Sequence, residues 1–142
     1  SMGYALPAAI SSNLEIKNKK IFAICGDGGF LMNVQEMETA KRLNSNIVVI
    51  IWEDKGYGLI KWKQQAEFGK STDLDFDNPD WGKLAKSFGW NYLFEDDSSN
   101  ITTQLQKTNK LTGPTLFVIP IDYSENEKLT SFLSSLEESY ND

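Results

Sequence analysis

Residues 20–33, KIFAICGDGGFLMN, run from an apolar stretch directly into a turn that holds three glycines and one acidic residue. Nearly continuous apolar runs are typical of strands that are buried on both faces of a parallel sheet. A glycine-rich turn between such a strand and a helix often binds phosphate, because its backbone N–H groups and the helix N-terminus converge there. Asp27 is therefore unexpected, since its carboxylate would repel a phosphate.

Three further apolar runs follow along the chain, over 46–52, 90–95 and 113–122. Amphipathic patterns lie between them and indicate helices. We expect helices from about Pro7 to residue 15 and over 33–43, 79–89, 98–111 and 128–140. Strands that alternate with helices predict an α/β domain with a doubly wound, mostly parallel sheet and helices on both faces. In such a domain, ligands bind at the carboxyl ends of the strands.

The helix expected over 33–43 has a local start signal. Asn33 can cap it, and Glu36 stands three residues later, as in a capping box with asparagine in place of serine or threonine. We therefore expect the helix to begin at Asn33, and we expect Phe30 and Met32, just before it, to be core residues.

Composition argues against several classes of protein. A net charge of −6 disfavours binding to nucleic acid or to an anionic membrane surface. No apolar run approaches the ~18 residues of a membrane span. The single cysteine, Cys25, is expected to be a buried thiol in a cytoplasmic protein. There is no histidine, so catalysis would need carboxylates or a cofactor. The 142 residues fit one domain, and because no strand precedes the first helix we expect that domain to belong to a longer chain.

The glycine-rich turn matches neither common phosphate motif. A dinucleotide fingerprint would need a third glycine where Leu31 stands, and a P-loop would need Gly-Lys-Ser/Thr. A carboxylate about 4 Å from a phosphate charge would cost about 4 kcal/mol at an effective dielectric constant near 20. A bridging cation reverses the sign, and magnesium is the cation favoured for diphosphates.

A second carboxylate follows the next apolar run. Glu53 and Asp54 come at its end, and Gly56 and Gly58 would let the backbone approach a ligand closely. Neighbouring parallel strands end side by side, so Asp27 and Asp54 are expected to converge. On these residues alone, the alternative that either aspartate is a solvated turn residue stays open.

The spacing of these residues resembles a known motif. Gly26-Asp27-Gly28, then the pair Glu53-Asp54 with Asp54 lying 27 positions after Asp27, then Tyr57-Gly58, is similar to the thiamine diphosphate motif. The resemblance covers residues 1–142 and is to the C-terminal cofactor-binding domain of the pyruvate decarboxylase and acetohydroxyacid synthase superfamily. Residues 53–64, EDKGYGLIKWKQ, are most similar to catabolic acetolactate synthases.

The resemblance implies a set of site residues. Asp27, Asp54 and the backbone carbonyl of Gly56 would bind Mg²⁺, while Glu53 would be a neighbour of the metal rather than a ligand. Met2 would brace thiamine diphosphate between its two rings. The remaining residues expected to contact the cofactor are Gly26, Asp27, Gly28, Gly29, Tyr57 and Gly58.

The resemblance also implies a reaction and partners. Two pyruvate molecules would give 2-acetolactate and CO₂, and a proton-relaying acid would come from the N-terminal pyrimidine-binding domain of a partner subunit. We therefore expect no catalytic side chain in this chain, no activity from the chain alone, and a homo-oligomer that binds neither nucleic acid nor membrane. The alternatives are another thiamine diphosphate-dependent 2-oxo acid decarboxylase or oxidase, and a non-catalytic binding or assembly module.

Three residues further along could border a substrate entrance. They are Lys61, Trp62 and Lys63, and an amphipathic surface segment is the favoured interpretation of them.

Overall fold

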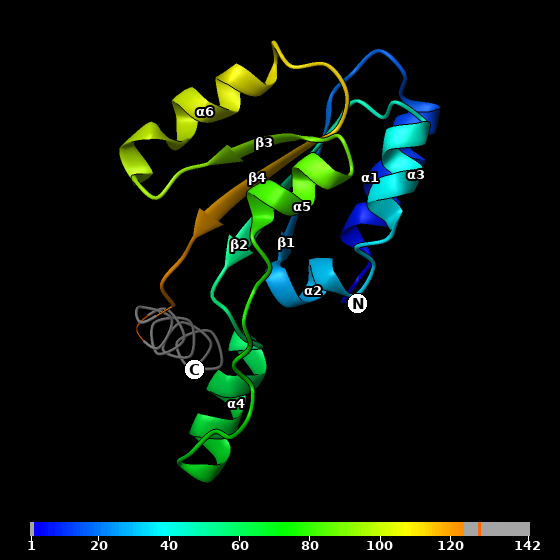
Figure 1. Cartoon of the computed structure of the whole chain (residues 1–142). Coiled ribbons are helices and arrows are strands. Elements are labelled where there is room, and N and C mark those ends of the chain that lie inside the picture. Colours follow the sequence, from blue (N-terminus) through cyan, green and yellow to red (C-terminus); the bar gives the residue numbers. More distant parts are fainter. Residues whose placement is uncertain (1, 124–127, 129–142) are drawn as a thin grey trace, which may run out of the picture.

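A computed structural model describes residues 2–123 and residue 128, and it contains a sheet of four parallel strands (Figure 1). The spatial order of the strands is β1-β2-β4-β3. Their bounds are β1 Ile21–Gly26, β2 Ile47–Glu53, β3 Asn91–Phe94 and β4 Thr115–Pro120. All four apolar runs of the sequence are therefore strands, and the predicted parallel sheet is confirmed.

The helices cover both faces of this sheet, as the doubly wound fold requires. One face carries α1 (Ala5–Glu15), α2 (Asp27–Leu31), α3 (Glu36–Arg42) and α5 (Trp81–Ser87). The other face carries α6 (Ile101–Thr108), which follows the short 3-10 helix η1 (Ser98–Asn100). The longest described helices have 11 residues, and nothing in the described part of the chain is both long and apolar enough to cross a bilayer.

Helix α4 (Gly58–Phe68) is the exception to this layering. It extends away from the body of the molecule in Figure 1, and none of its residues is buried. Leu59 and Phe68 on it are 67% and 70% exposed. The apolar residues of α4 therefore add little to the core formed by the described residues.

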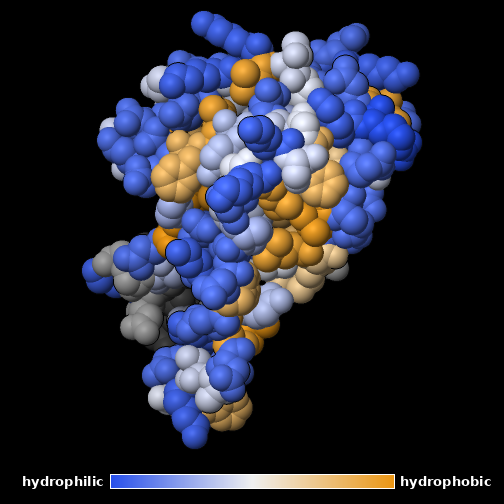
Figure 2. All heavy atoms as spheres, in the orientation of Figure 1, coloured by the Kyte–Doolittle hydropathy of each residue, from blue (hydrophilic) through white to orange (hydrophobic). Residues whose placement is uncertain are grey.

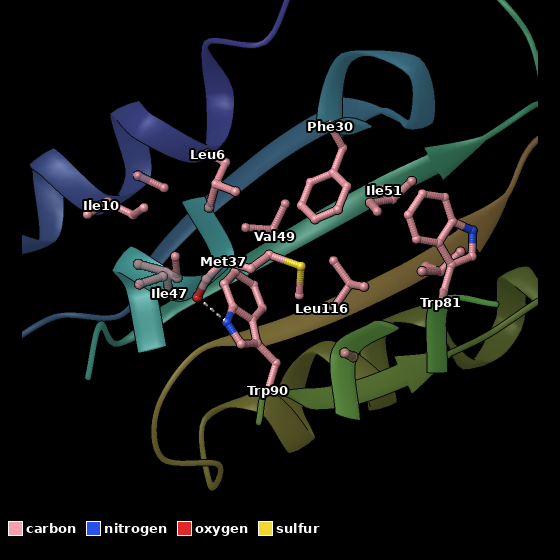
Figure 3. Packing of buried hydrophobic residues seen from close by; sticks show 14 residues of the cluster. Leu6, Ile10, Phe30, Met37, Ile47, Val49, Ile51, Trp81, Trp90 and Leu116 are labelled. Atoms are coloured by element: carbon pink, nitrogen blue, oxygen red, sulfur yellow. Dashed lines mark hydrogen bonds between the residues drawn. The ribbon is translucent and has the colours of Figure 1, made fainter. Parts of the chain in front are cut away.

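The larger core lies between the sheet and the first group of helices (Figure 3). Strand β2 is at its centre, because its first five residues are all buried. Two tryptophans close the core on the side of α5. Trp81 packs edge-on against Phe30 with ring centroids 5.8 Å apart, and Trp90 donates a hydrogen bond of 2.9 Å to the Met37 carbonyl.

The described residues cover the second face of the sheet less completely. Val48, Ile50, Phe117 and Ile119 pack under α6 and are buried, whereas Phe22 and Ile24 on the edge strand β1 are 46% and 54% exposed. Figure 2 shows one side of the molecule, mostly hydrophilic in its upper part and with an apolar area at the level of α2.

The segment after β1 differs from the sequence prediction. A short helix, α2, begins at Asp27 itself, and α3 begins only at Glu36. Asn33 caps neither helix, because its side chain donates a hydrogen bond of 2.6 Å to the Gly3 carbonyl instead. Phe30 is buried as predicted, but Met32 is 47% exposed, so its prediction as a core residue is wrong. The physical reason is the extra turn of α2, which shifts the face that Met32 presents.

The later helices are close to their predicted ranges. Helix α5 is capped by Asp80, whose side chain accepts a hydrogen bond from the Lys83 backbone N–H, so the helix begins two residues after Pro79. The expected helix over 98–111 is η1 followed by α6, and it ends at Thr108. Apart from residue 128, the helix expected over 128–140 lies outside the described part of the chain.

The central position of β2 leads to a stability prediction. Ile51 is 0% exposed, and we expect Ile51→Ala to lower the free energy of unfolding by about 2–5 kcal/mol because it leaves a cavity in the larger core. Leu59→Ala on α4 is the control and should change it by less than about 0.5 kcal/mol. Urea denaturation followed by tryptophan fluorescence measures both values. Similar losses in the two variants would contradict this account of the core.

Candidate functional site

The strand ends of β1 and β2 border a cavity of about 420 Å³. Such a position, at the carboxyl ends of parallel strands, is where α/β domains bind ligands. All the residues predicted from the sequence to bind metal or cofactor line this cavity, namely Met2, Gly26, Asp27, Gly28, Gly29, Asp54, Gly56, Tyr57 and Gly58. The lining also includes Ile24 and Tyr123, which the sequence analysis did not single out.

Asp27 is almost fully buried and is held by hydrogen bonds from three segments of the chain. Its Oδ1 accepts a bond of 2.7 Å from the Gly28 N–H, at the first turn of α2. Its Oδ2 accepts bonds of 2.8 Å from the Lys55 N–H and 2.7 Å from Asn78 Nδ2. A buried carboxylate needs such partners, because an unsatisfied one would be strongly destabilising. The orientation of Asp27 is therefore fixed before any ligand arrives.

Asp54 lines the same cavity as Asp27. Partial burial raises the pKa of Asp54 above its usual range, and the neighbouring Asp27 carboxyl group raises it further. Gly58 allows this placement, because a Cβ there would overlap Asp54 Oδ2. Two neighbouring acidic groups favour a proton or a cation between them.

The glycines of the turn play two different parts. A Cβ at Gly26 would meet nothing within 4 Å, and one at Gly29 only the Gly3 nitrogen at 3.9 Å, so the backbone there borders open space. At Gly28 the surroundings are closed. A Cβ would come within 2.8 Å of Tyr57 Cε1 and 3.2 Å of Phe76 Cζ.

The loop after β2 is held by a returning segment, residues 74–78, which we call the strap. The Tyr57 N–H donates a 3.0 Å bond to the Leu74 carbonyl, and the Phe76 N–H donates a 3.0 Å bond to the Lys55 carbonyl. Lys55 has a left-handed backbone with φ of 56°, which costs about 1–2 kcal/mol for a residue other than glycine. The strap thus stabilises a strained turn that points the Lys55 N–H at Asp27.

Beside the strap, the three residues considered for a substrate entrance lie on α4. Lys61 forms an ion pair of 2.8 Å with Asp75 of the strap. Lys61 and Trp62 border a second cavity beside Asp54, and Lys63 does not line it. Both interpretations of this segment, a border of a substrate entrance and an amphipathic surface segment, therefore stay predictions.

Met2 reaches the cavity through a turn at Gly3. Gly3 has φ of 76°, a conformation that favours glycine, and its carbonyl accepts the hydrogen bond from Asn33. Asn33 therefore helps to place Met2, which is 50% exposed at the rim of the cavity.

Glu53, unlike Asp27 and Asp54, does not line the cavity. Its Oε1 accepts bonds of 2.7 Å from Trp81 Nε1 and 3.0 Å from Asn78 Nδ2.

Cys25, below the turn, is partly buried, and burial together with the charge of Asp27 raises its pKa to about 12. The thiol therefore stays protonated at neutral pH.

Sequence analysis missed Asn78, Phe76 and the backbone of Lys55. Asn78 lies 51 positions after Asp27, in a segment without the apolar periodicity of a strand or helix, so no local pattern connects the two. The only signal was chemical, since an asparagine before Pro79 and a capping Asp80 marks a turn rather than a solvent-exposed strand.

The described residues contain no group of three or more acidic, histidine or cysteine side chains that could hold a metal ion. A cation at this site would therefore combine two carboxylates with oxygens from the backbone, a ligand or water. Oxygen ligands of this kind suit Mg²⁺.

These features define a class of protein: a parallel α/β domain that offers paired carboxylates and an open glycine turn at its strand ends. Residues 1–119 match the family model described as "Thiamine pyrophosphate enzyme, C-terminal TPP binding domain". The chain belongs to this family, and the resemblance noted from the motif is confirmed.

Curated relatives point to one branch of the family. The chain is 36% identical over 131 residues to an acetolactate synthase of Bacillus subtilis (strain 168), a match that covers 92% of the chain and 23% of the relative. It is 34% identical over 129 residues to a catabolic acetolactate synthase of Raoultella terrigena, covering 91% of the chain and 23% of that protein. The chain thus spans about a quarter of the length of these relatives.

The two environments of the turn glycines predict effects of different size on stability when a methyl group is added. Gly28→Ala should lower the free energy of unfolding by about 1–3 kcal/mol, because the Tyr57 and Phe76 rings must move away from the new Cβ. Gly26→Ala should change it by less than about 0.5 kcal/mol, because the space above it is open. Thermal and urea denaturation compare the two variants, and equal stabilities would show that the ring pair does not pack on Gly28 as described.

Proposed function

We propose that this domain binds the Mg²⁺-diphosphate end of thiamine diphosphate within a longer, cytoplasmic acetolactate synthase that converts two pyruvate molecules to 2-acetolactate and CO₂. The observation that carries the proposal is that the carboxylates of Asp27 and Asp54 line one cavity together with an open glycine turn. Membership of the family and the names of the relatives support the cofactor and the reaction.

The residues present fit a magnesium ion bridged to a diphosphate. Asp27 Oδ1 accepts a single described hydrogen bond, so a lone pair of that oxygen is available to a metal. Asp54 supplies a second carboxylate, and Gly56 borders the same cavity, so its carbonyl can complete the protein's share of the ligands. The open space at Gly26 and Gly29 lets diphosphate oxygens approach backbone N–H groups at the start of α2.

The side chains of this chain bind and orient, and the cofactor carries the chemistry. When bound, thiamine diphosphate supplies the carbon nucleophile and the electron sink that decarboxylation of a 2-oxo acid needs. Asp27 and Asp54 would hold the metal, Tyr57 and Gly58 would contact the diphosphate, and Met2 at the rim would support the cofactor between its rings. The apolar part of the cavity wall, with Ile24, would keep water away from the reacting end.

The described part of the chain offers no side chain that would be free to transfer protons at this site. Among the described residues, the only acidic side chains that line the cavity are Asp27 and Asp54, and both would be committed to the metal. An acid from the pyrimidine-binding domain of a partner subunit would complete the site, so the active form would be a homo-oligomer of the longer chain.

The metal bridge predicts unequal effects of removing the two carboxylates. In the full-length protein with magnesium, Asp27→Ala should weaken thiamine diphosphate binding at least about tenfold, because it removes a ligand and leaves the Asn78 and Lys55 donors unpaired. Asp54→Asn should weaken it less, since the amide keeps an oxygen for the metal. With a chelator the order of the affinities for thiamine diphosphate should invert, because each substitution then removes a negative charge that repels the diphosphate.

Calorimetric titration of thiamine diphosphate, with magnesium and with chelator, measures these affinities. Equal affinity of wild type and Asp27→Ala in magnesium would exclude the metal bridge.

A second prediction concerns the reaction itself. The full-length protein should convert pyruvate to 2-acetolactate, whereas the 142-residue chain, given magnesium and thiamine diphosphate, should show no carboligation because the acid is missing. Product analysis distinguishes the alternatives, since acetaldehyde would indicate a decarboxylase and acetyl phosphate an oxidase. Turnover by the chain alone would contradict the account of the incomplete site.

A further inference from the structure

Behind the metal-facing carboxylates, one amide connects two acidic side chains. Asn78 Nδ2 donates to Asp27 Oδ2 at 2.7 Å and to Glu53 Oε1 at 3.0 Å. Both protons of the amide are thereby used, and both partners are carboxylate oxygens that can only accept. The orientation of the amide is fixed by this chemistry, because a flipped amide would point its oxygen at two carboxylates.

The far end of this connection is anchored in the core. Glu53 Oε1 also accepts the 2.7 Å hydrogen bond from Trp81 Nε1. Trp81 is 5% exposed and packs against Phe30, which follows the glycine turn on α2. The chain of contacts from Asp27 through Asn78 and Glu53 to Trp81 therefore starts and ends on the same face of the sheet.

The near end of the connection depends on the strap. Asn78 is its last residue, and the hydrogen bonds of Leu74 and Phe76 hold the strap to the loop that carries Asp54. Asp27 Oδ2 thus receives one proton from the strap side chain and one from the Lys55 backbone of that loop. With Oδ2 engaged twice, Oδ1 is the oxygen left to face the cavity.

We propose that Asn78 is a positioning residue for the metal, holding Asp27 so that Oδ1 faces the cavity, with Glu53 and Trp81 fixing the amide from behind. This inference rests on the proposed binding of a magnesium-diphosphate group. It gives Glu53 a definite part: its side chain accepts the second amide proton and does not contact the metal. Asn78 acts only through Asp27.

A competing role for the same residue makes the proposal testable. Asn78 Oδ1 is buried and has no hydrogen-bond partner among the described residues, so it could itself be a metal ligand. The two roles differ in their response to Asn78→Asp. If Asn78 positions Asp27, the new carboxylate is harmful, because it cannot donate to Asp27 and would repel both acidic neighbours. If Asn78 is a metal ligand, the new carboxylate would bind the metal as well as the amide or better.

The experiment titrates Mg²⁺ into the full-length protein in saturating thiamine diphosphate, by calorimetry, and measures the magnesium dependence of the rate. Asn78→Ala should raise the magnesium concentration for half-saturation about tenfold, and Asn78→Asp should raise it more. At saturating magnesium the Asn78→Ala rate should return to within about twofold of wild type, because Asn78 does not touch substrate or cofactor. A merely structural role would lower the amount of folded protein without moving the half-saturation point.

Two further variants protect the test against simple unfolding. Trp81→Phe removes the indole N–H and keeps an aromatic ring, and it should raise the half-saturation point by a smaller factor of about three. Asn91→Ala is the matched control. Asn91 is a part-buried amide at the opposite end of the sheet whose Nδ2 donates to the Thr112 carbonyl at 2.8 Å, so its loss should lower stability and leave the magnesium affinity unchanged.

The outcomes separate this inference from the function on which it rests. Magnesium affinity equal to wild type in Asn78→Ala, or tighter binding in Asn78→Asp, would overturn the positioning role while leaving the metal site in place. A wild-type protein that binds neither magnesium nor thiamine diphosphate would overturn the proposed function and this inference together.

Discussion

The buried carboxylate of Asp27 is the constraint on which the ligand end of the molecule depends. The start of α2, the loop after β2 and the strap each contribute one donor to it, through Gly28, Lys55 and Asn78. Without that carboxylate, these three donors would lose their acceptor, and the start of α2 would lose its hydrogen-bonded link to the loop and the strap. The cavity has its shape because these segments meet at one charged group.

The same group sets an opposing requirement. Asp27 and Asp54 line the same cavity, where burial first and then the charge of Asp27 raise the pKa of Asp54, so two charged carboxylates are unfavourable there. Hydrogen bonds to the Asp27 carboxylate offset part of this cost in the absence of a ligand. A dication bound there would offset the rest, so the same features that make two charged carboxylates unfavourable would favour a cation.

Sequence reasoning recovered the parts of the structure that rest on local pattern. Strands β1 and β2 are apolar runs, and the paired aspartates follow from where parallel strands end. It failed at α2, because a helix that starts on a Gly-Asp-Gly-Gly turn has poor intrinsic propensity and is stabilised by tertiary packing of Phe30. It also missed Asn78, whose role arises only when the strap folds back over 51 positions of chain.

Helix α4 buries none of its side chains against the rest of the described domain. Substitutions on it escape the main selective filter on globular proteins, which is loss of folding stability. Its N-terminus is nevertheless fixed beside Asp54 by Gly58, so whatever it presents is presented at the ligand end. Changes along α4 would therefore alter what this end of the domain presents while leaving the packing of the described core intact.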